Sequence, residues 1–432
     1  MGHRAVFTVF RSVFSLLLSF GLLLLANGLF NSLLALRASQ EGMSSTHVGM
    51  IMSSHFVGML IGGLYAGRVV AGVGHIRAFA AFASSLSVAA LMHAIFVDLV
   101  PWMSLRLVTG FCTAGMIMVT ESWINERSGS KYRGSVLAIY MMINYLGSGS
   151  GQLLLKLGDI GEFHLFSLAS IIFSLALLPV LLTRHSAPIL ERGSRLSIIA
   201  VVRLGPLAVA GIFTAGLINA SINTLAPVYA MDMYGSASQA ANFTAVMLVS
   251  GFVLQWPLGR LSDVVGRGVL IALVAIMIAA CSLGMVFSAN YMPQWILAMA
   301  FVYGAFLYTL YSLCSALIND VIDASMRVRV AGAALIIYGV GAIIGPLVVG
   351  LLTDMIGHQA LFLFSFAASS ALAAFAIYRR IYQAIFVKPV QPFVPVPSQQ
   401  LPSDELYLAT QDDQETLPGA TTEDNQGVLD RS

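Results

Sequence analysis

The feature that most constrains this chain is the length of its apolar runs. A helix of about 20 apolar residues spans the roughly 30 Å hydrocarbon core of a bilayer, and a helix satisfies its own backbone hydrogen bonds there. The chain is therefore expected to form twelve transmembrane helices. They are expected at residues 12–36, 47–70, 76–97, 101–124, 134–157, 162–183, 205–230, 240–262, 268–288, 293–318, 330–353 and 358–379.

Composition excludes a water-soluble globule. Hydrophobic residues make up 58% of the 432 residues and charged residues only 10%, whereas a soluble domain carries about 25% charged residues. The first apolar run is too long for a signal peptide, so no cleaved leader is expected. The three cysteines, Cys112, Cys281 and Cys314, lie inside apolar runs without metal or disulfide spacing. We expect neither a metal site nor a cofactor.

The basic residues predict the orientation. Most of the 22 Lys and Arg residues fall in the termini and the even-numbered loops, as Arg127, Lys131 and Arg133 do. Because cytoplasmic loops are enriched in Lys and Arg, both termini and the central linker are predicted to be cytoplasmic.

An internal repeat divides the chain. Asn27 and Asn31 return as Asn219 and Asn223, at an offset of 192 residues, and further matches follow in order at offsets up to 198. Such a repeat predicts two homologous halves of six helices. The domains are expected at 1–183 (first half), 184–204 (cytoplasmic linker), 205–380 (second half) and 381–432 (a Pro-rich, acidic, disordered tail). The tail is interpreted as solvated or as docking a partner.

Four motifs carry a family resemblance: Arg106-Leu-Val-Thr-Gly110, Glu121-Ser-Trp123, Arg133-Gly134 and the stretch from Leu254 to Arg267. On these residues the chain resembles the major facilitator superfamily, and more closely its bacterial YcaD-like branch. The resemblance implies an all-α membrane protein of two pseudo-symmetric six-helix bundles. It also implies a carrier of the bacterial inner (cytoplasmic) membrane that works as a monomer.

The same resemblance implies a cytoplasmic gate. The stretch from Gly259 to Arg267 is similar to the signature loop of the family, in which an aspartate at the membrane edge faces the N-terminus of a helix in the other half. The first half has Ala66 where that aspartate belongs. The alternative is that the acidic and basic residues only order a loop. The gate residues implied are Gly259, Arg260, Asp263, Gly266 and Arg267, with Arg133 at the start of the fifth helix.

Paired amides are the cavity candidates. Asn27 and Asn31 are four residues apart and share one helix face, as Asn219 and Asn223 do. Amides in hydrocarbon are costly unless they are paired, so the pairs indicate either contacts between helices or a watered cavity. Tyr140 and its repeat equivalent Tyr338 are further candidates.

Three titratable groups within the helices are candidates for proton coupling: Arg106, Glu121 and His55. An unpaired arginine at mid-membrane costs about 2.5–3.5 kcal/mol or more. Arg106 resembles the helix-4 arginine that the family uses in proton coupling, but it could also pair with a carbonyl or reach outward. Glu121 could instead form a structural ion pair with nearby basic residues, and His55 could be a hydrogen-bonded helix contact. So few charges disfavour a strongly charged substrate.

The sequence therefore predicts a secondary transporter of a small solute that works by alternating access with proton coupling. The alternatives are an uncoupled facilitator and a solute sensor that signals through the tail. A phosphate-binding loop and a catalytic Ser/His/Asp cluster are both missing from the sequence, which argues against ATP drive and against an enzyme. The expected partners are the lipid bilayer, the solute and protons, and no nucleic acid.

Overall fold

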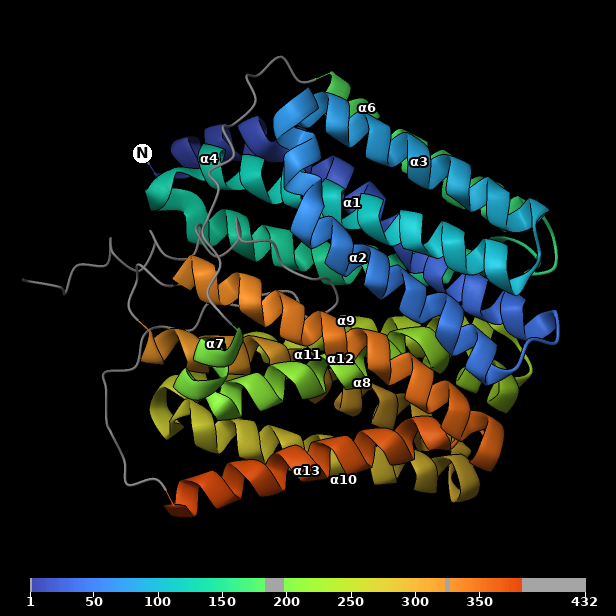
Figure 1. Ribbon diagram of the computed structural model, residues 1–432, viewed down its shortest axis with the longest axis vertical. Coiled ribbons are helices and arrows are strands. Elements are labelled where there is room, and N and C mark those ends of the chain that lie inside the picture. Colours follow the sequence, from blue (N-terminus) through green and yellow to red (C-terminus); the bar gives the residue numbers. More distant parts are fainter. Residues whose placement is uncertain (1, 183–197, 323–326, 383–432) are drawn as a thin grey trace, which may run out of the picture.

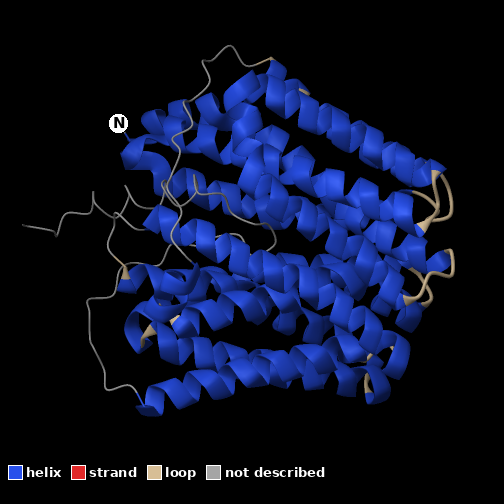
Figure 2. Ribbon diagram, in the orientation of Figure 1, coloured by secondary structure: helices blue, strands red, loops and turns tan. Residues whose placement is uncertain are grey.

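The computed structural model describes residues 2–182, 198–322 and 327–382. Within these ranges nearly every residue is helical (Figure 2). The first half contains α1 (Gly2–Gln40), α2 (Ser45–Val73), α3 (His75–Ile95), α4 (Leu99–Leu153), η1 (Leu154–Leu157), α5 (His164–Leu175) and α6 (Leu178–Leu181). The second half contains α7 (Ile198–Leu204), α8 (Pro206–Tyr234), α9 (Ala237–Val265), α10 (Arg267–Tyr291), η2 (Pro293–Trp295), α11 (Ile296–Val321), α12 (Arg327–Ile356) and α13 (Ala360–Tyr382).

Helix α4 contains two membrane crossings. The sequence predicted separate helices at 101–124 and 134–157, but the helix runs without a break over 55 residues. The chain nevertheless reverses direction within it, as shown by the Tyr140 hydroxyl, which lies 2.6 Å from a carboxylate oxygen of Glu121. A straight helix would separate residues so far apart in sequence by about 28 Å. The side chains of 125–135, where the loop was expected, lie outside the described residues.

The sixth crossing differs from the prediction in the opposite way. The sequence predicted one helix at 162–183, but the structure has α5 and the short α6, interrupted at Ala176 and Leu177. Pro179 follows the interruption directly. Proline has no backbone N–H to donate and its ring clashes with the preceding turn, so the helix ends and restarts there.

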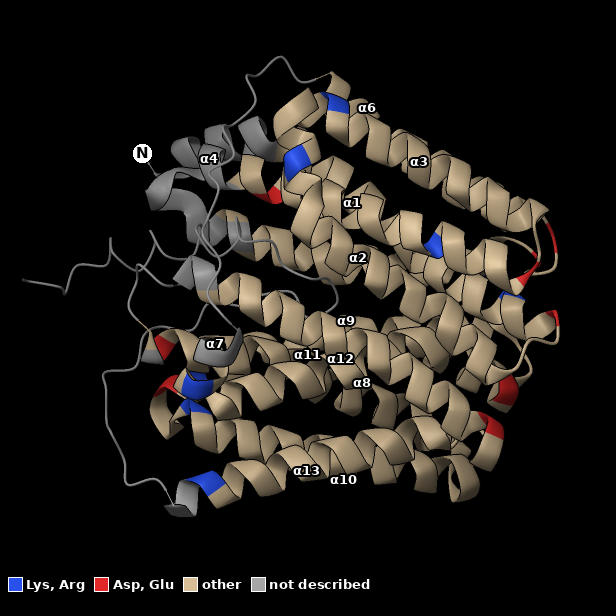
Figure 3. Ribbon diagram, viewed as in Figure 1, with Lys and Arg blue, Asp and Glu red and all other residues tan. Residues whose placement is uncertain are grey.

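The twelve-helix prediction is confirmed. Eleven helices of the described residues are long and apolar enough to cross a bilayer, and the second part of α4 supplies the twelfth. Figure 3 shows that the charged residues gather at the two ends of the bundle and are sparse between them.

Equivalent close contacts repeat in the two halves. A Cβ atom on Gly110 of α4 would lie 2.0 Å from the carbonyl oxygen of His55 on α2. At the matching position in α11, a Cβ atom on Gly304 would lie 2.3 Å from the carbonyl oxygen of Met247 on α9. Small residues let helix backbones approach this closely. The internal repeat is therefore also a repeat of packing geometry.

The bundle has two ends that the following sections distinguish. The linker end is where α6 ends and α7 begins, and it includes Gly74 between α2 and α3 and Gly266 between α9 and α10. Helix α13 also ends there (Figure 1). The distal end lies opposite and includes the turns at Gly42, Gly235 and Gly357, all of which have positive φ. The two halves meet along α2 and α12 and along α4 and α9.

Candidate functional site

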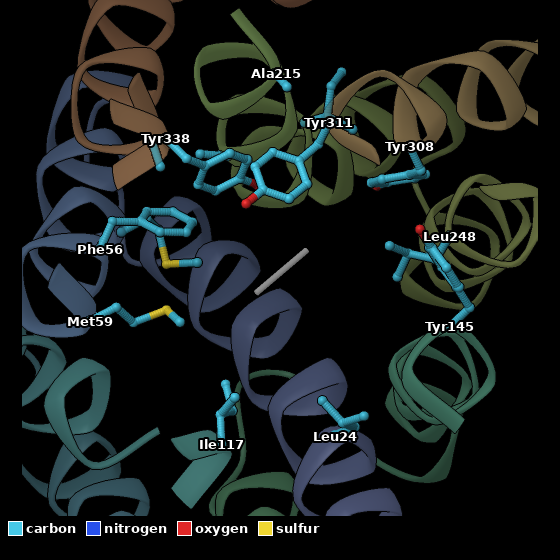
Figure 4. Packing of buried hydrophobic residues seen from close by; sticks show 14 of the residues in the cluster. Leu24, Phe56, Met59, Ile117, Tyr145, Ala215, Leu248, Tyr308, Tyr311 and Tyr338 are labelled. Carbon is cyan, nitrogen blue, oxygen red and sulfur yellow. The ribbon is translucent and has the colours of Figure 1, made fainter. Parts of the chain in front are cut away.

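A small polar cavity lies between the two halves. Its volume is about 70 Å³, which is room for a few water molecules. The walls come from α1, α2 and α4 of the first half and from α8 and α9 of the second. The lining residues are Asn27, Gly28, Asn31, Met52, His55, Phe56, Met59, Arg106, Thr113, Ser148, Gln152, Asn223, Thr224 and Leu248. Figure 4 shows Phe56, Met59, Leu248, Tyr308, Tyr311 and Tyr338 arranged around one central space.

Arg106 is the charged residue of the cavity wall. Its side chain is 1% exposed, and its guanidinium carbon lies 5.9 Å from the centre of the Phe30 ring. Nε and Nη1 have no hydrogen-bond partner among the described residues. Among the described residues, the wall contains no aspartate or glutamate. A cation over an aromatic face is stabilised only in part, so Arg106 has no full counter-charge within the described structure.

His55 lies beside Arg106 because α2 and α4 pack closely at Gly110. Its Nδ1 is 3.4 Å from the Thr109 hydroxyl oxygen, and that hydroxyl donates to the carbonyl oxygen of Arg106 at 2.9 Å. His93 packs against Phe30, the ring that Arg106 also approaches. The two rings meet edge-on, with their centres 5.2 Å apart. Two of the three predicted coupling residues, His55 and Arg106, therefore share one wall of the cavity.

The third predicted coupling residue lies elsewhere. Glu121 is 2% exposed and accepts a 2.6 Å hydrogen bond from the Tyr140 hydroxyl. The Tyr140 ring stacks on Phe20 at 4.4 Å. Neither Glu121 nor Tyr140 lines the cavity, so Tyr140 holds together two crossings of the first half. The basic residues predicted near Glu121, including Arg133, have side chains outside the described residues.

The structure separates the asparagines. Asn27 and Asn31 of α1 and Asn223 of α8 line the cavity, and Asn223 accepts a 2.9 Å hydrogen bond from the Tyr308 hydroxyl. Asn219 is fully buried and shares a hydrogen bond with Tyr338. Three of the four asparagines thus lie at a cavity, and the fourth, Asn219, lies at a contact between helices.

The aromatic residues of the second half form a group around the central space. Tyr338 packs edge-on against Tyr311, with ring centres 5.1 Å apart. Tyr308 packs in the same way against Tyr145 of the first half at 6.2 Å. Figure 4 shows Tyr311 and Tyr338 facing this space together with Phe56 of α2.

Sequence reasoning missed several polar residues of the cavity wall: Thr113, Ser148, Gln152 and Thr224. Gln152 of α4 accepts a hydrogen bond from Ser32 and a 3.3 Å hydrogen bond from Thr244 across the halves. An amide inside an apolar run was a signal that would have found Gln152. Threonine and serine are common in membrane helices, so the other positions carried no comparable signal.

Five of the predicted gate residues, Gly259, Arg260, Asp263, Gly266 and Arg267, lie at the linker end. The Arg267 side chain is 2% exposed and lies between two aspartates, 3.2 Å from Asp263 and 2.9 Å from Asp320. Arg260 lies with its guanidinium 3.9 Å from the centre of the Trp256 ring. Gly266 joins α9 to α10 with a φ of 92°.

These ion pairs all lie within the second half, since Asp263 belongs to α9, Arg267 to α10 and Asp320 to α11. Gly259 is buried in α9. The proposed partner in the first half, Arg133, lies outside the described side chains.

Twelve membrane-crossing helices in two equivalent bundles, with a polar cavity between them, define a multi-pass membrane transporter. The profile of the Major Facilitator Superfamily matches residues 16–334 and again residues 208–404. The chain belongs to the Major Facilitator Superfamily.

Its relatives agree with this assignment. The chain is 29% identical over 361 residues to the uncharacterized MFS-type transporter YcaD of Salmonella paratyphi A, covering 83% of this chain and 93% of that protein. Among solved structures, the nucleoside transporter NupG superimposes with a TM-score of 0.73 at 14% identity, over 85% of this chain and 99% of NupG in its D323A form. A bacterial homologue of the human lysosomal transporter Spinster gives 0.69 at 14% identity, over 85% and 96%. At such identities the structures show a shared fold.

Proposed function

We propose that this protein is a secondary carrier that moves a small solute by alternating access. The observation that supports this function best is the polar cavity with walls from both halves. Carriers of this architecture bind their solute near the mid-membrane, at the interface between two repeats that rock against each other. A site shared by both halves is the site whose accessibility changes when they rock.

The tight packing of the distal end supports the alternating mechanism. A Cβ atom on Gly49 of α2 would lie 2.4 Å from the carbonyl oxygen of Pro346 on α12. A Cβ atom on Gly350 would lie 2.4 Å from the carbonyl oxygen of Ser45. The halves are in backbone contact there, so solute has no passage between α2 and α12.

The proposed setting is the bacterial inner membrane, with the linker end in the cytoplasm. The predominance of Lys and Arg in the termini and even-numbered loops supports this orientation. In this setting the close contact between α2 and α12 lies on the periplasmic side, which supports a state closed toward the periplasm. The gate at Asp263 would then close the cytoplasmic side in the opposite state.

Proton coupling is the finer part of the proposal. A titratable group inside a membrane helix is costly and usually functional. His55 and Arg106 lie in the cavity wall, and Glu121 is buried with a hydrogen bond from Tyr140. Glu121 and His55 are the groups proposed to take up the proton, and Arg106 is the fixed positive charge beside His55.

The test uses the full-length protein in proteoliposomes with a pH-sensitive dye inside. Metabolites, siderophores and drugs are added one at a time. A solute-dependent pH change that disappears in Arg106→Ala supports proton-coupled transport. Solute movement without a pH change identifies a facilitator. A variant without residues 389–432 should still move solute. Loss of a cellular response in that variant, with no solute movement by the full chain, would identify a sensor.

A further inference from the structure

The cavity holds a buried positive charge without a counter-ion. Arg106 is the cation, and the described residues place neither aspartate nor glutamate in the wall. Two of its three guanidinium nitrogens, Nε and Nη1, are buried and make no hydrogen bond with the part of the chain that the structure describes. Buried charges in proteins are almost always paired, because removing a partner leaves the full desolvation cost in place. An unpaired guanidinium at a cavity therefore points to a partner that comes from outside the chain.

Other polar atoms of the same wall are also without partners. The hydroxyl oxygens of Thr113 and Thr224 and the carbonyl oxygen of Asn31 are buried and make no hydrogen bond within the described structure. All three residues line the cavity, Asn31 and Thr113 from the first half and Thr224 from the second. Most buried polar atoms in native proteins are hydrogen-bonded. Unmet hydrogen bonds on both sides of one cavity indicate a polar ligand that spans it.

We propose that the cavity binds an organic anion with a single anionic group, which pairs with the Arg106 guanidinium. A guanidinium offers parallel N–H donors that match the two oxygens of a carboxylate or of a phosphate. One arginine balances one negative charge, so a monoanion leaves the occupied cavity neutral.

The other residues of the cavity wall indicate the chemical character of the ligand beyond its anionic group. Met52, Phe56 and Met59 on α2 and Leu248 on α9 give the cavity apolar surface beside its polar groups. The amides of Asn27 and Asn223 offer further hydrogen bonds. The ligand is therefore a small amphipathic acid, with a hydroxyl or similar polar group that reaches Thr224.

Neutralisation also links the anion to the proposed carrier function. When the halves rock, Arg106 must remain surrounded by low-dielectric protein and lipid. A neutral, occupied cavity crosses this step at lower cost than a cavity with an uncompensated cation. This refines the expectation from sequence, which disfavoured a strongly charged solute, because a single charge is the amount that the wall can balance.

The test is ligand-induced stabilisation of the full-length protein in detergent, followed by tryptophan fluorescence on heating. The probes are matched pairs of the same size that suit so small a cavity: acetate and acetamide, lactate and lactamide. Dimethyl phosphate, a monoanion, separates a phosphate site from a carboxylate site. We expect at least one acid to raise the Tm by about 3 °C at a concentration about 100 times its Kd, and its amide to have no effect.

Variants assign the effect to the cavity. The Arg106→Gln variant should lose the whole shift, and Arg106→Lys should keep part of it. Arg77→Gln removes the same charge from the exposed surface of α3 and should keep the shift. Without ligand, Arg106→Gln should melt at the wild-type temperature or above it, because it removes an uncompensated charge.

Three results overturn the proposal: amides that stabilise as well as acids, no acid that stabilises at all, or an Arg106→Gln protein that melts well below wild type without ligand. The proposal rests on the carrier function but fails separately from it. Transport of a neutral solute into proteoliposomes would support the carrier function and contradict the anion site. An acid that binds through Arg106 but is not transported would support the anion site and contradict the carrier function.

Discussion

The two ends of the bundle are held by different kinds of contact. At the distal end, α2 and α12 belong to opposite halves and touch through their backbones at Gly49 and Gly350. Asp354 of α12 also accepts hydrogen bonds from the backbone N–H groups of Ser45 and Thr46, at 2.8 and 2.9 Å. At the linker end, the two ion pairs of Arg267 described here, with Asp263 and with Asp320, join three helices of the second half.

This difference supports the proposal that the linker end separates while the distal end stays closed. Closely packed backbones lose about a quarter to a half of their dispersion energy when they move about 0.5–1 Å apart. The distal end is therefore either closed or fully open. An ion network inside one half moves with that half as a unit, so it leaves the other half free. The comparison predicts that distal substitutions act on closure and that linker-end substitutions act within the second half.

The largest effect is expected from Gly49→Leu. The added side chain would clash with the carbonyl oxygen of Pro346, a backbone atom that cannot move away by a rotamer change. We expect the distal end to stay open, transport to stop, and the free energy of unfolding to fall by about 3 kcal/mol. SDS titration and proteoliposome uptake measure the two effects. The control is Gly72→Leu on the same helix, where an added Cβ meets nothing within 4 Å. Equal behaviour of the two variants would show that backbone contact does not govern closure.

The second prediction concerns Asp263→Asn, which should stop transport while leaving the protein folded. The Asp263 side chain is 33% exposed, and an ion pair of such exposure contributes at most about 1 kcal/mol. In the proposed gate, its charge would instead help to close the linker end against a helix N-terminus of the other half. Uptake and yield of purified protein are the measurements. Normal uptake by the variant would remove Asp263 from the proposed gate.

The third prediction separates the two partners of Arg267. The Asp320 side chain is 13% exposed and that of Arg267 is 2% exposed, so Asp320→Asn removes the more buried of the two described carboxylate partners of a buried cation. We expect the free energy of unfolding to fall by about 2 kcal/mol, more than in Asp263→Asn. Thermal melts of both variants in the same detergent provide the comparison. A larger loss in Asp263→Asn would show that the more exposed ion pair carries the stability.

The membrane crossings could be predicted from the sequence, but the points where the helices are interrupted or continuous could not all be predicted. The length of an apolar run decides whether a helix can cross, so the twelve crossings were predictable. The continuity of α4 depends on backbone geometry between two crossings, which composition does not encode. The division at Pro179 was within reach, because proline in a helix interior is a known breaker.

The candidate site could be predicted only at positions where a polar or charged residue interrupts an apolar run. Arg106 and the asparagines stand out in apolar runs, and Arg106, Asn27, Asn31 and Asn223 do line the cavity. That Arg106 meets no acid among the described side chains could not be predicted, since pairing depends on which helices become neighbours. Asn219 shares a helix with Asn223 but faces Tyr338 instead. The roles of all these residues stay predictions.

The smallest effect is expected from Asp354→Asn, which weakens the polar contact across the distal end. The Asp354 carboxylate accepts three hydrogen bonds at the start of α2, one of them from the Thr46 hydroxyl at 2.6 Å. An asparagine keeps one acceptor oxygen and loses the charge that favours a helix N-terminus. At an exposed site we expect a loss of about 1 kcal/mol from the closed state, or about a fivefold shift toward distal opening.

Spin labels on cysteines introduced at His47 and Met355, both exposed at this end, report the separation of α2 from α12 by pulsed electron resonance. The matched control is Asp98→Asn. Asp98 also caps a helix, accepting a 2.6 Å hydrogen bond from the N–H of Leu99, but the contact stays within the first half. The control should leave the distance distribution unchanged. If Asp354→Asn also leaves it unchanged, the polar contact of Asp354 is not needed to hold the distal end. The remaining contacts between α2 and α12, which include the backbone contacts at Gly49 and Gly350 and the 2.8 Å hydrogen bond from the Ser53 hydroxyl to the Ile343 carbonyl oxygen, are then sufficient.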